Sequence, residues 1–527
     1  MQALPFISSL TRCSSKVAAM PFGCLSVFVT WLNLMTISPS SQAAAAVLAV
    51  TASAKAVAAV ARNFMNISSQ SIENKRNPDE SRPLVAQRMR WIRTGLKRLT
   101  NLADIKAFES LASKPAQGRT QGLPSPLDPS NALLMTLWQQ LPTDPAFVQD
   151  PYPAYAKARA LAPVQHWPAY GMTAVFSYKL VMQILKDRRF GREAIEPAEI
   201  PPHLAPFYAI EAHSMLELEP PRHTRLRSLV LRAFTSRRIK ELAPEIQSIC
   251  DDLLDKIPQD QPFDLIKHYA TPIPVIIICR LLGVPESMSD QLLMWSNDMV
   301  AMYQARRDRT IEDRAAQAAT DFANFIREFA EEKRKHPAND LITQLLNAEE
   351  NGNKLSMDEL ITTCILLLNA GHEATVHTLG NGVKTLIESQ TLPSALADQA
   401  IDQTVEEILR YDPPLHVFTR YCYEDLNLDG HSFKRGDEIA LMLAAANRDG
   451  VQWPDPNGFE PSRKIQTNTS FGGGLHFCVG APLARLELRV ALPKLFTRFP
   501  QLQITAPPKY ADLYHFHGLE RLMLTTN

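Results

Sequence analysis

Apolar residues recur at helical spacing along most of the chain beyond residue 150. Two runs, 239–254 and 316–335, place apolar residues every three or four positions, and prolines separate such runs from their neighbours. A longer stretch without proline begins at Ser356 and continues to Glu388, and its first four residues, S-M-D-E, have the form of a capping box. We expect one helix of about thirty residues here, which at about 1.5 Å per residue is long enough to cross a whole domain.

Strand patterns are short and occur late in the chain. Alternating or β-branched pieces lie at 418–423 and 438–443. The composition of the 527 residues, 45% apolar and 21% charged, is that of an ordinary folded protein with a large core or several cores. The chain is therefore predicted to be mainly α-helical with a small β component.

The N-terminal part of the chain has a different character. An apolar stretch at 17–37 has the outline of a secretory signal or anchor, and the basic amphipathic segment 84–99 is typical of helices that lie on a membrane. A segment rich in Pro, Gly, Ser and Gln, 114–128, is the expected linker. We expect residues 1–134 to be a disordered, targeting or mis-assigned N-terminal extension, and residues 135–527 to form the working domain.

The formal net charge of zero combines two parts of opposite sign. Residues 1–134 hold 15 basic and 6 acidic side chains, which leaves 40 basic and 49 acidic side chains for residues 135–527. The extension is therefore basic and the main domain acidic. Because nucleic-acid binding depends on basic side chains that neutralise phosphates, we expect no nucleic-acid partner. Any membrane contact is expected only through the extension.

One of the seven cysteines is distinguished by its surroundings. The seven form no C-x-x-C pair and are widely spaced, so neither a disulfide framework nor a structural zinc site is expected. Cys478 follows a glycine-rich loop and precedes Ala481-Pro482, where a proline in the first turn predicts a helix start. A cysteine at a helix N-terminus meets unpaired amide donors and the positive end of the dipole, which both favour a thiolate.

A phosphate-binding, hydrolytic or purely structural loop fits these residues less well. A P-loop requires Gly-Lys-Ser/Thr after the glycines, and a cysteine hydrolase requires a better placed base than a histidine two residues away. A buried structural role is the commonest one for a single cysteine. The spaced residues of the loop are Phe471, Gly474, His476, Cys478 and Gly480. This spacing argues against a purely structural cysteine, and a lone thiolate suits the axial position of a haem iron better than zinc.

With these residues the sequence resembles the cytochrome P450 family, in its soluble bacterial branch. The motif F-x-x-G-x-H-x-C-x-G is matched in full and is highly specific. Further family signatures occur in the right order at 223–227, 370–375, 407–410 and 459–463. The resemblance runs from about residue 150 to residue 524. It implies the family fold, a helix-rich triangular prism that holds haem b between the long distal helix and the helix after the cysteine loop.

The resemblance also implies roles for individual residues. Cys478 would be the axial ligand of the haem iron. The donors suited to the two haem propionates are His223, Arg227, Arg420 and His476. The other residues expected at the cofactor are Phe471, Gly474 and Gly480 in the loop and the small residues Ala370 and Gly371 in the long helix. Small residues on that helix also suit tight helix packing, which is the alternative role for them.

An acid in the long helix points to proton delivery. Glu373 lies in an otherwise apolar run, where an unpaired buried carboxylate is costly. The family usually carries threonine after this acid, whereas this chain has Ala374, with Thr375 one step later and about 100° further around the helix. Thr375, an ordered water or a hydroxyl of the substrate would replace the missing group. Glu373 and Thr375 are the predicted catalytic residues.

The resemblance implies a haem-thiolate monooxygenase that uses O2, an apolar small-molecule substrate, and electrons from a separate ferredoxin and its reductase. The expected docking face lies near Cys478, where Arg485 would meet an acidic partner. The segments 193–217 and 415–418 are expected to wall the substrate pocket. Two alternatives remain: an isomerase, dehydratase or peroxygenase of the same family, or a non-catalytic haem protein that binds a ligand. The expected location is the cytoplasm, with membrane association through the extension as the alternative.

Overall fold

The computed structural model describes residues 137–196, 199–303, 307–350, 352–391, 393–513 and 516–526. The chain divides into two units, Met1–Pro126 and Leu127–Asn527, and all described residues belong to the second unit. The expected extension, its linker and its two membrane-directed segments therefore lie outside the described residues. Within them, no helix combines the length and apolar character that a membrane crossing requires.

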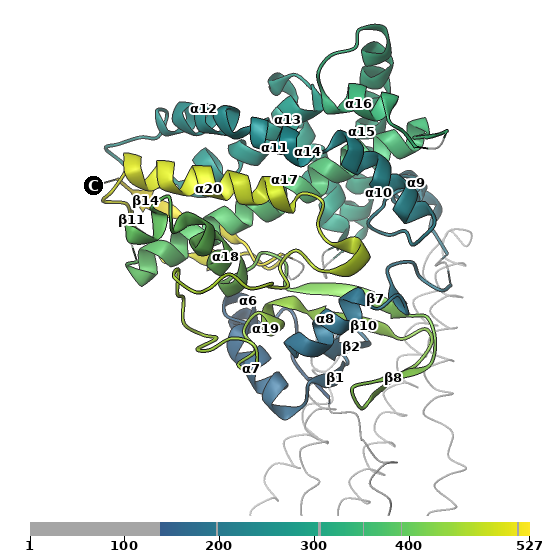
Figure 1. The fold of residues 1–527 in the computed structure, drawn as a ribbon, viewed down its shortest axis with the longest axis vertical. Helices are drawn as coiled ribbons and strands as arrows, with labels where there is room; N and C mark the ends of the chain where they lie inside the picture. The colour runs from purple at the N-terminus through teal and green to yellow at the C-terminus, as the bar shows by residue number, and fades with distance from the viewer. Residues whose placement is uncertain are drawn as a thin grey trace, which may run out of the picture. The chain divides into compact units, whose positions relative to one another are not determined.

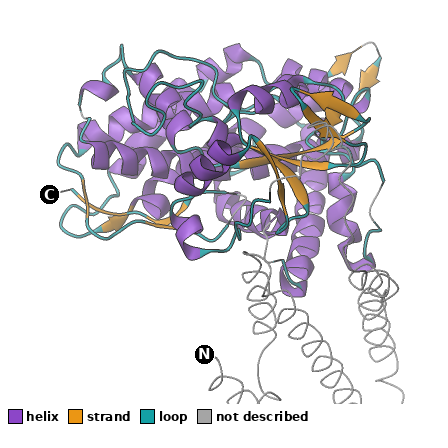
Figure 2. Cartoon of the chain, turned by 90° about the horizontal axis from the view of Figure 1, so that it is seen from below, coloured by secondary structure: helices purple, strands orange, loops and turns teal. Residues whose placement is uncertain are grey.

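Helices dominate this unit, which confirms the predicted fold class (Figures 1 and 2). The α-helices are α6 (Pro145–Gln149), α7 (Tyr152–Leu161), α8 (Tyr178–Lys186), α9 (Ala205–Glu211), α10 (Arg222–Ala233), α11 (Ser236–Glu241), α12 (Ala243–Leu254), α13 (Pro272–Leu282), α14 (Ser289–Val300), α15 (Arg309–Lys335), α16 (Leu341–Asn347), α17 (Met357–Ser389), α18 (Ile401–Tyr411), α19 (Leu443–Ala446) and α20 (Ala481–Arg498). Short helical turns are η3 (Pro202–Leu204), η4 (Ile266–Ala270), η5 (Glu286–Met288), η6 (Ala301–Tyr303), η7 (Ser394–Leu396) and η8 (Gly474–His476).

The strands form one mixed sheet and several short pairings. The main sheet has the order β1-β2-β10-β7-β3, in which β10 runs parallel to β2 and antiparallel to β7. Its strands are β1 (Val164–Trp167), β2 (Met172–Val175), β3 (Phe190–Gly191), β7 (Val417–Cys422) and β10 (Glu438–Met442). The remaining strands are β4 (Phe263–Asp264), β5 (Glu349–Glu350), β6 (Asn353–Lys354), β8 (Leu426–Leu428), β9 (His431–Phe433), β11 (Gln503–Ile504), β12 (Lys509–Tyr510), β13 (Leu519–Arg521) and β14 (Met523–Thr525).

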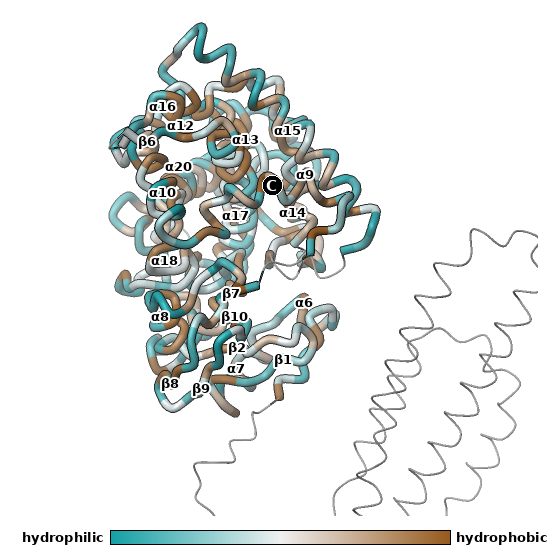
Figure 3. The backbone as a smooth tube through the Cα atoms, turned by 90° about the vertical axis from the view of Figure 1, so that its right-hand side faces the viewer, coloured by the Kyte–Doolittle hydropathy of each residue, from teal (hydrophilic) through white to brown (hydrophobic). Residues whose placement is uncertain are grey.

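The central strand β10 is buried on both faces. Ile439 and Leu441 belong to the cluster that α8 covers, whereas Ala440 and Met442 belong to the cluster on the other face, around Trp167. This division follows from the two-residue period of a strand. The tube view places this sheet with α6, α7 and α8, next to the larger helical part (Figure 3). The sheet therefore forms a layer with its own two small cores.

The long helix is the predicted one, and it runs through the main hydrophobic core. Ser356 caps α17 and accepts a hydrogen bond from the amide of Glu359, while the Glu359 carboxylate accepts one from the amide of Ser356. Each end of this capping box satisfies an amide that the helix leaves unpaired. Helices α13, α14, α15 and α20 all contact α17 (Figure 1). The capping box was therefore correctly predicted, and the helix ends one residue later than expected.

Other predicted boundaries differ slightly from the observed ones. The run 239–254 is two helices, α11 and α12, because the chain turns at Leu242 before Ala243-Pro244. A proline cannot donate the hydrogen bond that a continuous helix needs at this point. The strand predicted at 418–423 begins one residue earlier, at Val417, and the one at 438–443 ends at Met442.

A buried ionic network joins α18 to the loop before the cysteine. Arg410 donates to both oxygens of Glu407 at 2.7 Å, and Arg463 donates to the same carboxylate at 3.1 and 3.2 Å. Arg410 is 1% exposed and Glu407 is 2% exposed. The family signatures at 407–410 and 459–463 thus meet in one ionic network, and its burial makes it a structural group.

Candidate functional site

The loop that carries Cys478 is folded against α8. The amide of Cys478 donates to the carbonyl of Phe471 at 3.0 Å and closes the loop. Gly472 and Gly474 both have positive φ, +67° and +65°, which side chains rarely adopt. At Gly474 an added Cβ would collide with the carbonyl oxygen of Leu185 at the end of α8. Glycine is therefore required here for close approach of two backbones.

The Cys478 sulfur faces the start of α20. It accepts hydrogen bonds from the amides of Gly480 and Ala481, and the charges of Arg227 and Arg485 also favour a thiolate. Burial has the larger effect, however, and raises the pKa of the Cys478 thiol. The predicted amide donors are thus present, but they do not ionise the sulfur on their own. A metal cation bound to the sulfur would supply the missing charge.

Among the described residues, three cationic or hydrogen-bonding side chains in this region form no ion pair, although Glu219 and Glu217 favour the charge of Arg420. His223 is 1% exposed, and neither of its ring nitrogens has a hydrogen-bond partner. Burial, with smaller effects from neighbouring cations, lowers the pKa of His223 to about 4. Burial likewise lowers the pKa of Arg420 to about 10, and its guanidinium donates to the carbonyl of Thr419 at 2.7 Å. Arg227 donates to the carbonyl of Phe477 at 2.5 Å, beside Cys478.

His476 belongs to the same group but already has an acidic partner. Its Nε2 lies 2.9 Å from Oε1 of Glu219, and its ring lies 4.4 Å from that of His223. The same Glu219 oxygen accepts a hydrogen bond from the amide of Arg192 at 2.7 Å. Arg192 and Glu219 were not predicted from the sequence, since neither carries a signal of its own apart from the fold. They place a second arginine and a carboxylate beside Arg420.

These residues fit a haem. Orphaned ring nitrogens on His223 and the guanidinium of Arg420, whose charge burial disfavours, suit the two carboxylates that a haem carries. A half-buried thiol at the end of a close-packed glycine loop suits an axial ligand to iron. His223, Arg227, His476 and Cys478 thus lie close together around the cysteine loop and the start of α10, whereas Ala370 and Gly371 lie on α17. Their individual contacts to the cofactor remain predictions.

The middle of α17 is less buried than the stretches on either side of it. Ala370 is exposed and Glu373 and Ala374 are half-buried, whereas residues 360–365 and 375–383 are buried. At Gly371 an added Cβ would lie 2.8 Å from Cδ1 of Ile278 in α13. Tight helix packing, the alternative to a cofactor role, thus applies to Gly371. Ala370 and Glu373 remain on the accessible stretch.

Thr375 points to a neighbour that the sequence did not suggest. Its hydroxyl donates to the carbonyl of Gly371 at 3.2 Å, and it is hydrogen-bonded to the carboxyl of Glu487 in α20. Glu487 is 2% exposed, and burial raises its pKa to about 8, an effect that the bond to Thr375 partly offsets. Thr375 is therefore engaged between two helices. Glu373 has no such tie, since its Oε2 is buried without a partner.

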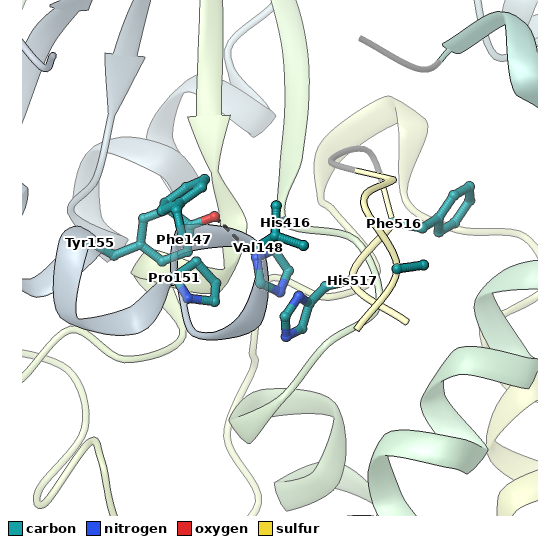
Figure 4. Close-up of a pocket in the computed structure, with 8 residues that line it drawn as sticks. Phe147, Val148, Pro151, Tyr155, His416, Phe516 and His517 are labelled. Carbon is teal, nitrogen blue, oxygen red and sulfur yellow. Dashed lines mark hydrogen bonds between the residues drawn. The ribbon is translucent and has the colours of Figure 1, made fainter. Parts of the chain in front are cut away.

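A second buried cluster has the composition of a metal site. Atoms of Asp412, His416 and His517 lie within 4.8 Å of one another. The two histidine rings lie side by side at a pocket that is also lined by Phe147, Val148, Pro151, Tyr155, Ala511 and Phe516 (Figure 4). The carboxylate of Asp412 accepts hydrogen bonds from two tyrosine hydroxyls, at 2.6 Å from Tyr152 and 2.5 Å from Tyr510.

The charges around this cluster argue against a bound cation. Both oxygens of Asp412 already accept hydrogen bonds. Burial lowers the pKa of His517 to about 3, and the positive charges of Lys384 and Arg448 lower it in the same direction. A divalent ion would be repelled by the same two cations. The cluster therefore acts as a hydrogen-bonded tie between α7, the end of α18 and the C-terminal loop.

The expected docking residue is also paired within the chain. Arg485 forms an ion pair with Glu406 of α18, and its guanidinium lies 4.5 Å from the ring centroid of Phe471. It is thus held against the cysteine loop and contributes charge there. Its use by a redox partner remains a prediction.

Replacing Gly474 should loosen the cysteine loop. We expect Gly474→Ala to lower the free energy of unfolding by about 2–4 kcal/mol, because strained φ and a backbone clash add together. Gly430→Ala is the matched control, since Gly430 has φ +83° but open space around its Cβ position, and it should lose only about 1 kcal/mol. Chemical denaturation of the two proteins would reveal the difference, and equal losses would contradict the clash.

Glu487 should make the stability of the protein depend on pH. Its folded pKa of about 8 lies above the unfolded value of 4.5, so the unfolded state ionises first as the pH rises. Wild-type stability should therefore fall between pH 5 and 8, by at most about 1.4 kcal/mol per pH unit from this group. Glu487→Gln should remove that contribution, whereas Glu328→Gln at an exposed position of α15 should not. The same pH dependence of the free energy of unfolding in wild type and in Glu487→Gln would contradict this role of Glu487.

Comparison with known proteins identifies the family. The family model described as "Cytochrome P450" matches residues 165–398 and 399–511. Cytochrome P450 107B1 of Saccharopolyspora erythraea is 38% identical over 398 residues, which cover 72% of this chain and 96% of that protein. Vitamin D(3) 25-hydroxylase of Pseudonocardia autotrophica is 37% identical over 394 residues, which cover 72% of this chain and 94% of that protein.

Solved structures give the same result for the fold. P450BioI, in complex with an acyl carrier protein that carries hexadec-9Z-enoic acid, has a TM-score of 0.69 at 31% identity and covers 72% of this chain and 99% of its own. The cytochrome P450 PksS of Bacillus subtilis has a TM-score of 0.68 at 32% identity, with 74% and 100% covered. The cofactor of the family is haem, whose iron carries an axial cysteine thiolate. The chain therefore belongs to the cytochrome P450 family and is a haem-thiolate monooxygenase.

Proposed function

We propose that this enzyme inserts one oxygen atom of O2 into an apolar small-molecule substrate and releases the other as water, with electrons from a separate ferredoxin and its reductase. The observation that carries the proposal is the Cys478 loop. There a single half-buried thiol faces two amide donors at the start of α20 and lies next to donors suited to the haem propionates. A thiolate ligand of this kind favours cleavage of the O–O bond.

The residues around the cofactor would bind and orient it. Bound haem supplies the iron at which O2 is reduced and split. Cys478 would hold the iron through its sulfur, which the amides of Gly480 and Ala481 orient at the start of α20. His223 would gain a partner for ring nitrogens that otherwise lie buried without one, and Arg420 would gain an anionic partner for a charge that burial disfavours. Binding of the cofactor would thus stabilise the fold around it.

Glu373 would hold the proton that oxygen cleavage consumes. Its carboxylate lies on the accessible stretch of α17 and has one oxygen without a partner. Thr375 would help to hold that stretch in place. Its hydroxyl is hydrogen-bonded to the carbonyl of Gly371 and to the carboxyl of Glu487. With Ala374 in the usual hydroxyl position, water or a substrate hydroxyl would complete the path between Glu373 and the oxygen.

The substrate would be apolar with some polar groups. Relatives of the chain include a vitamin D(3) 25-hydroxylase and a 6-deoxyerythronolide B hydroxylase, which supports a substrate of this class. The proposed wall 193–217 contains Glu211, whose pKa burial raises to about 7 and which accepts a hydrogen bond from Tyr303 at 3.0 Å. An acyl carrier protein is the partner of one related structure, so a carrier-bound substrate is an alternative to a free one. We propose the cytoplasm as the location, where a ferredoxin partner is available.

Reconstitution tests this function. We expect purified protein with ferredoxin, reductase and NAD(P)H to consume NAD(P)H in a substrate-dependent way and to form an oxygenated product. The reduced, carbon-monoxide-bound form should show the thiolate-type Soret band, and Cys478→Ala should abolish it because the ligand is lost. Turnover with peroxide alone would instead support a peroxygenase, and the absence of turnover with a broad panel would support a ligand-binding role.

We also propose that residues 135–527 carry this activity alone. The alignment with cytochrome P450 107B1 covers 96% of that protein but only 72% of this chain, so the relative has no counterpart for the remaining residues. A chain that begins at Met135 should load haem and turn over within about twofold of the full-length protein. A loss of haem loading in the shorter chain would show that the extension contributes to the fold.

A further inference from the structure

A histidine without a hydrogen-bond partner among the described residues, His377, lies one helical turn beyond Glu373. Nε2 of His377 lies 3.7 Å from Oε1 of Glu373. Both ring nitrogens of His377 and Oε2 of Glu373 are buried and make no hydrogen bond within the described residues. Because an unsatisfied buried polar atom costs about 1–3 kcal/mol, the two side chains gain from pairing with each other.

The surroundings of His377 leave little alternative to this pairing. The ring of Phe516 lies 5.8 Å from the imidazole, and a Cβ on Gly518 would collide with the imidazole ring. The C-terminal loop therefore lies tightly over one side of His377, where glycine alone fits. A separation of 3.7 Å is longer than a hydrogen bond of 2.7–3.2 Å. A small rotation of either side chain toward the other would close it.

The other titratable groups facing His377 do not compete for Glu373. His372, on the same helix, has its Nδ1 at 2.8 Å from the carbonyl of Leu368, and burial lowers its pKa. His517, on the C-terminal loop, has a pKa of about 3, which burial lowers most and His377 lowers further. Both are neutral at neutral pH. Among the residues that the structure describes, no lysine or arginine forms an ion pair with Glu373.

We propose that His377 is a positioning residue for Glu373, whose Oε1 accepts a hydrogen bond from His377 Nε2–H. The inference rests on the role of Glu373 in the proposed function. A carboxylate held in this way keeps one orientation and leaves Oε2, which has no hydrogen-bond partner among the described residues, for the proton path.

Substitutions at 377 separate positioning from packing. His377→Leu removes the donor and should lower the fraction of NAD(P)H electrons found in product, rather than in peroxide, by about fivefold or more. His377→Gln keeps an amide donor and should restore most of that fraction. Thr385→Val, which keeps its size at a buried position of the same helix, is the matched control and should behave as wild type.

A double-mutant cycle tests whether His377 acts through Glu373. If it does, Glu373→Gln and the double variant with His377→Leu should couple electrons to product equally poorly. Wild-type coupling in His377→Leu, or additive losses in the double variant, would overturn the proposal. If wild type itself fails to turn over, the proposed function fails, and the pairing is then decided by a measurement that needs no turnover.

That measurement is the ¹³C NMR signal of His377 at fixed pH in the ferrous, carbon-monoxide-bound protein, with labelled histidine. The His377→Gln protein assigns the signal. Glu373→Gln should shift this signal, because the imidazole loses the carboxylate that lies beside it. Thr385→Val should leave it unchanged. A His377 signal with the same chemical shift with and without the Glu373 carboxylate would contradict the pairing.

Discussion

Desolvation of the half-buried Cys478 sulfur is the constraint on which the rest of the site depends. Loss of contact with water disfavours a thiolate, and it raises the pKa of Cys478 despite two amide donors and two arginines nearby. The loop thus holds a ligand that is completed by a metal cation. The glycines that bring the loop against α8 leave the sulfur fixed in place, because Gly474 admits no side chain beside Leu185. The close packing of the loop and the unfavourable charge of a thiolate therefore both favour a metal cation as the partner of the Cys478 sulfur.

The ionic network behind the loop explains how this position is held. Arg410 donates to the carbonyls of Asn447, Pro456 and Gly458 as well as to Glu407. The side chain of Asn447 in turn accepts from the amide of Thr469, and Ser470 donates to the carbonyl of Leu409 near the end of α18. Ser470 directly precedes Phe471, whose carbonyl accepts the hydrogen bond from the amide of Cys478. A buried charge network far from the chemistry thus anchors the segment that presents the ligand.

The sequence predicted elements best where a signal is local. The capping box at Ser356 and the proline at the start of α20 are chemical signals within four residues, and both were confirmed. The strands β1 and β2 were missed because each is four residues long, and because their pairing with each other and the pairing of β2 with β10 are properties of the folded chain. The break between α11 and α12 was missed because the hydrophobic period continues across it. Periodicity predicts which face is buried, while hydrogen-bond donors decide where a helix stops.

The same distinction applies to the site. Cys478 and its glycines were predictable because they form a contiguous motif, but Glu487 and His377 acquire meaning only through contacts between distant segments. Thr375, which lies two positions after Glu373 in the sequence, is bonded to Glu487 in α20. His377, four positions away, lies beside Glu373 and beneath Gly518. In a helix, residues one turn apart share a face whereas residues one or two positions apart do not. The group best placed to act on Glu373 is therefore the one a turn away rather than its nearer neighbour in sequence.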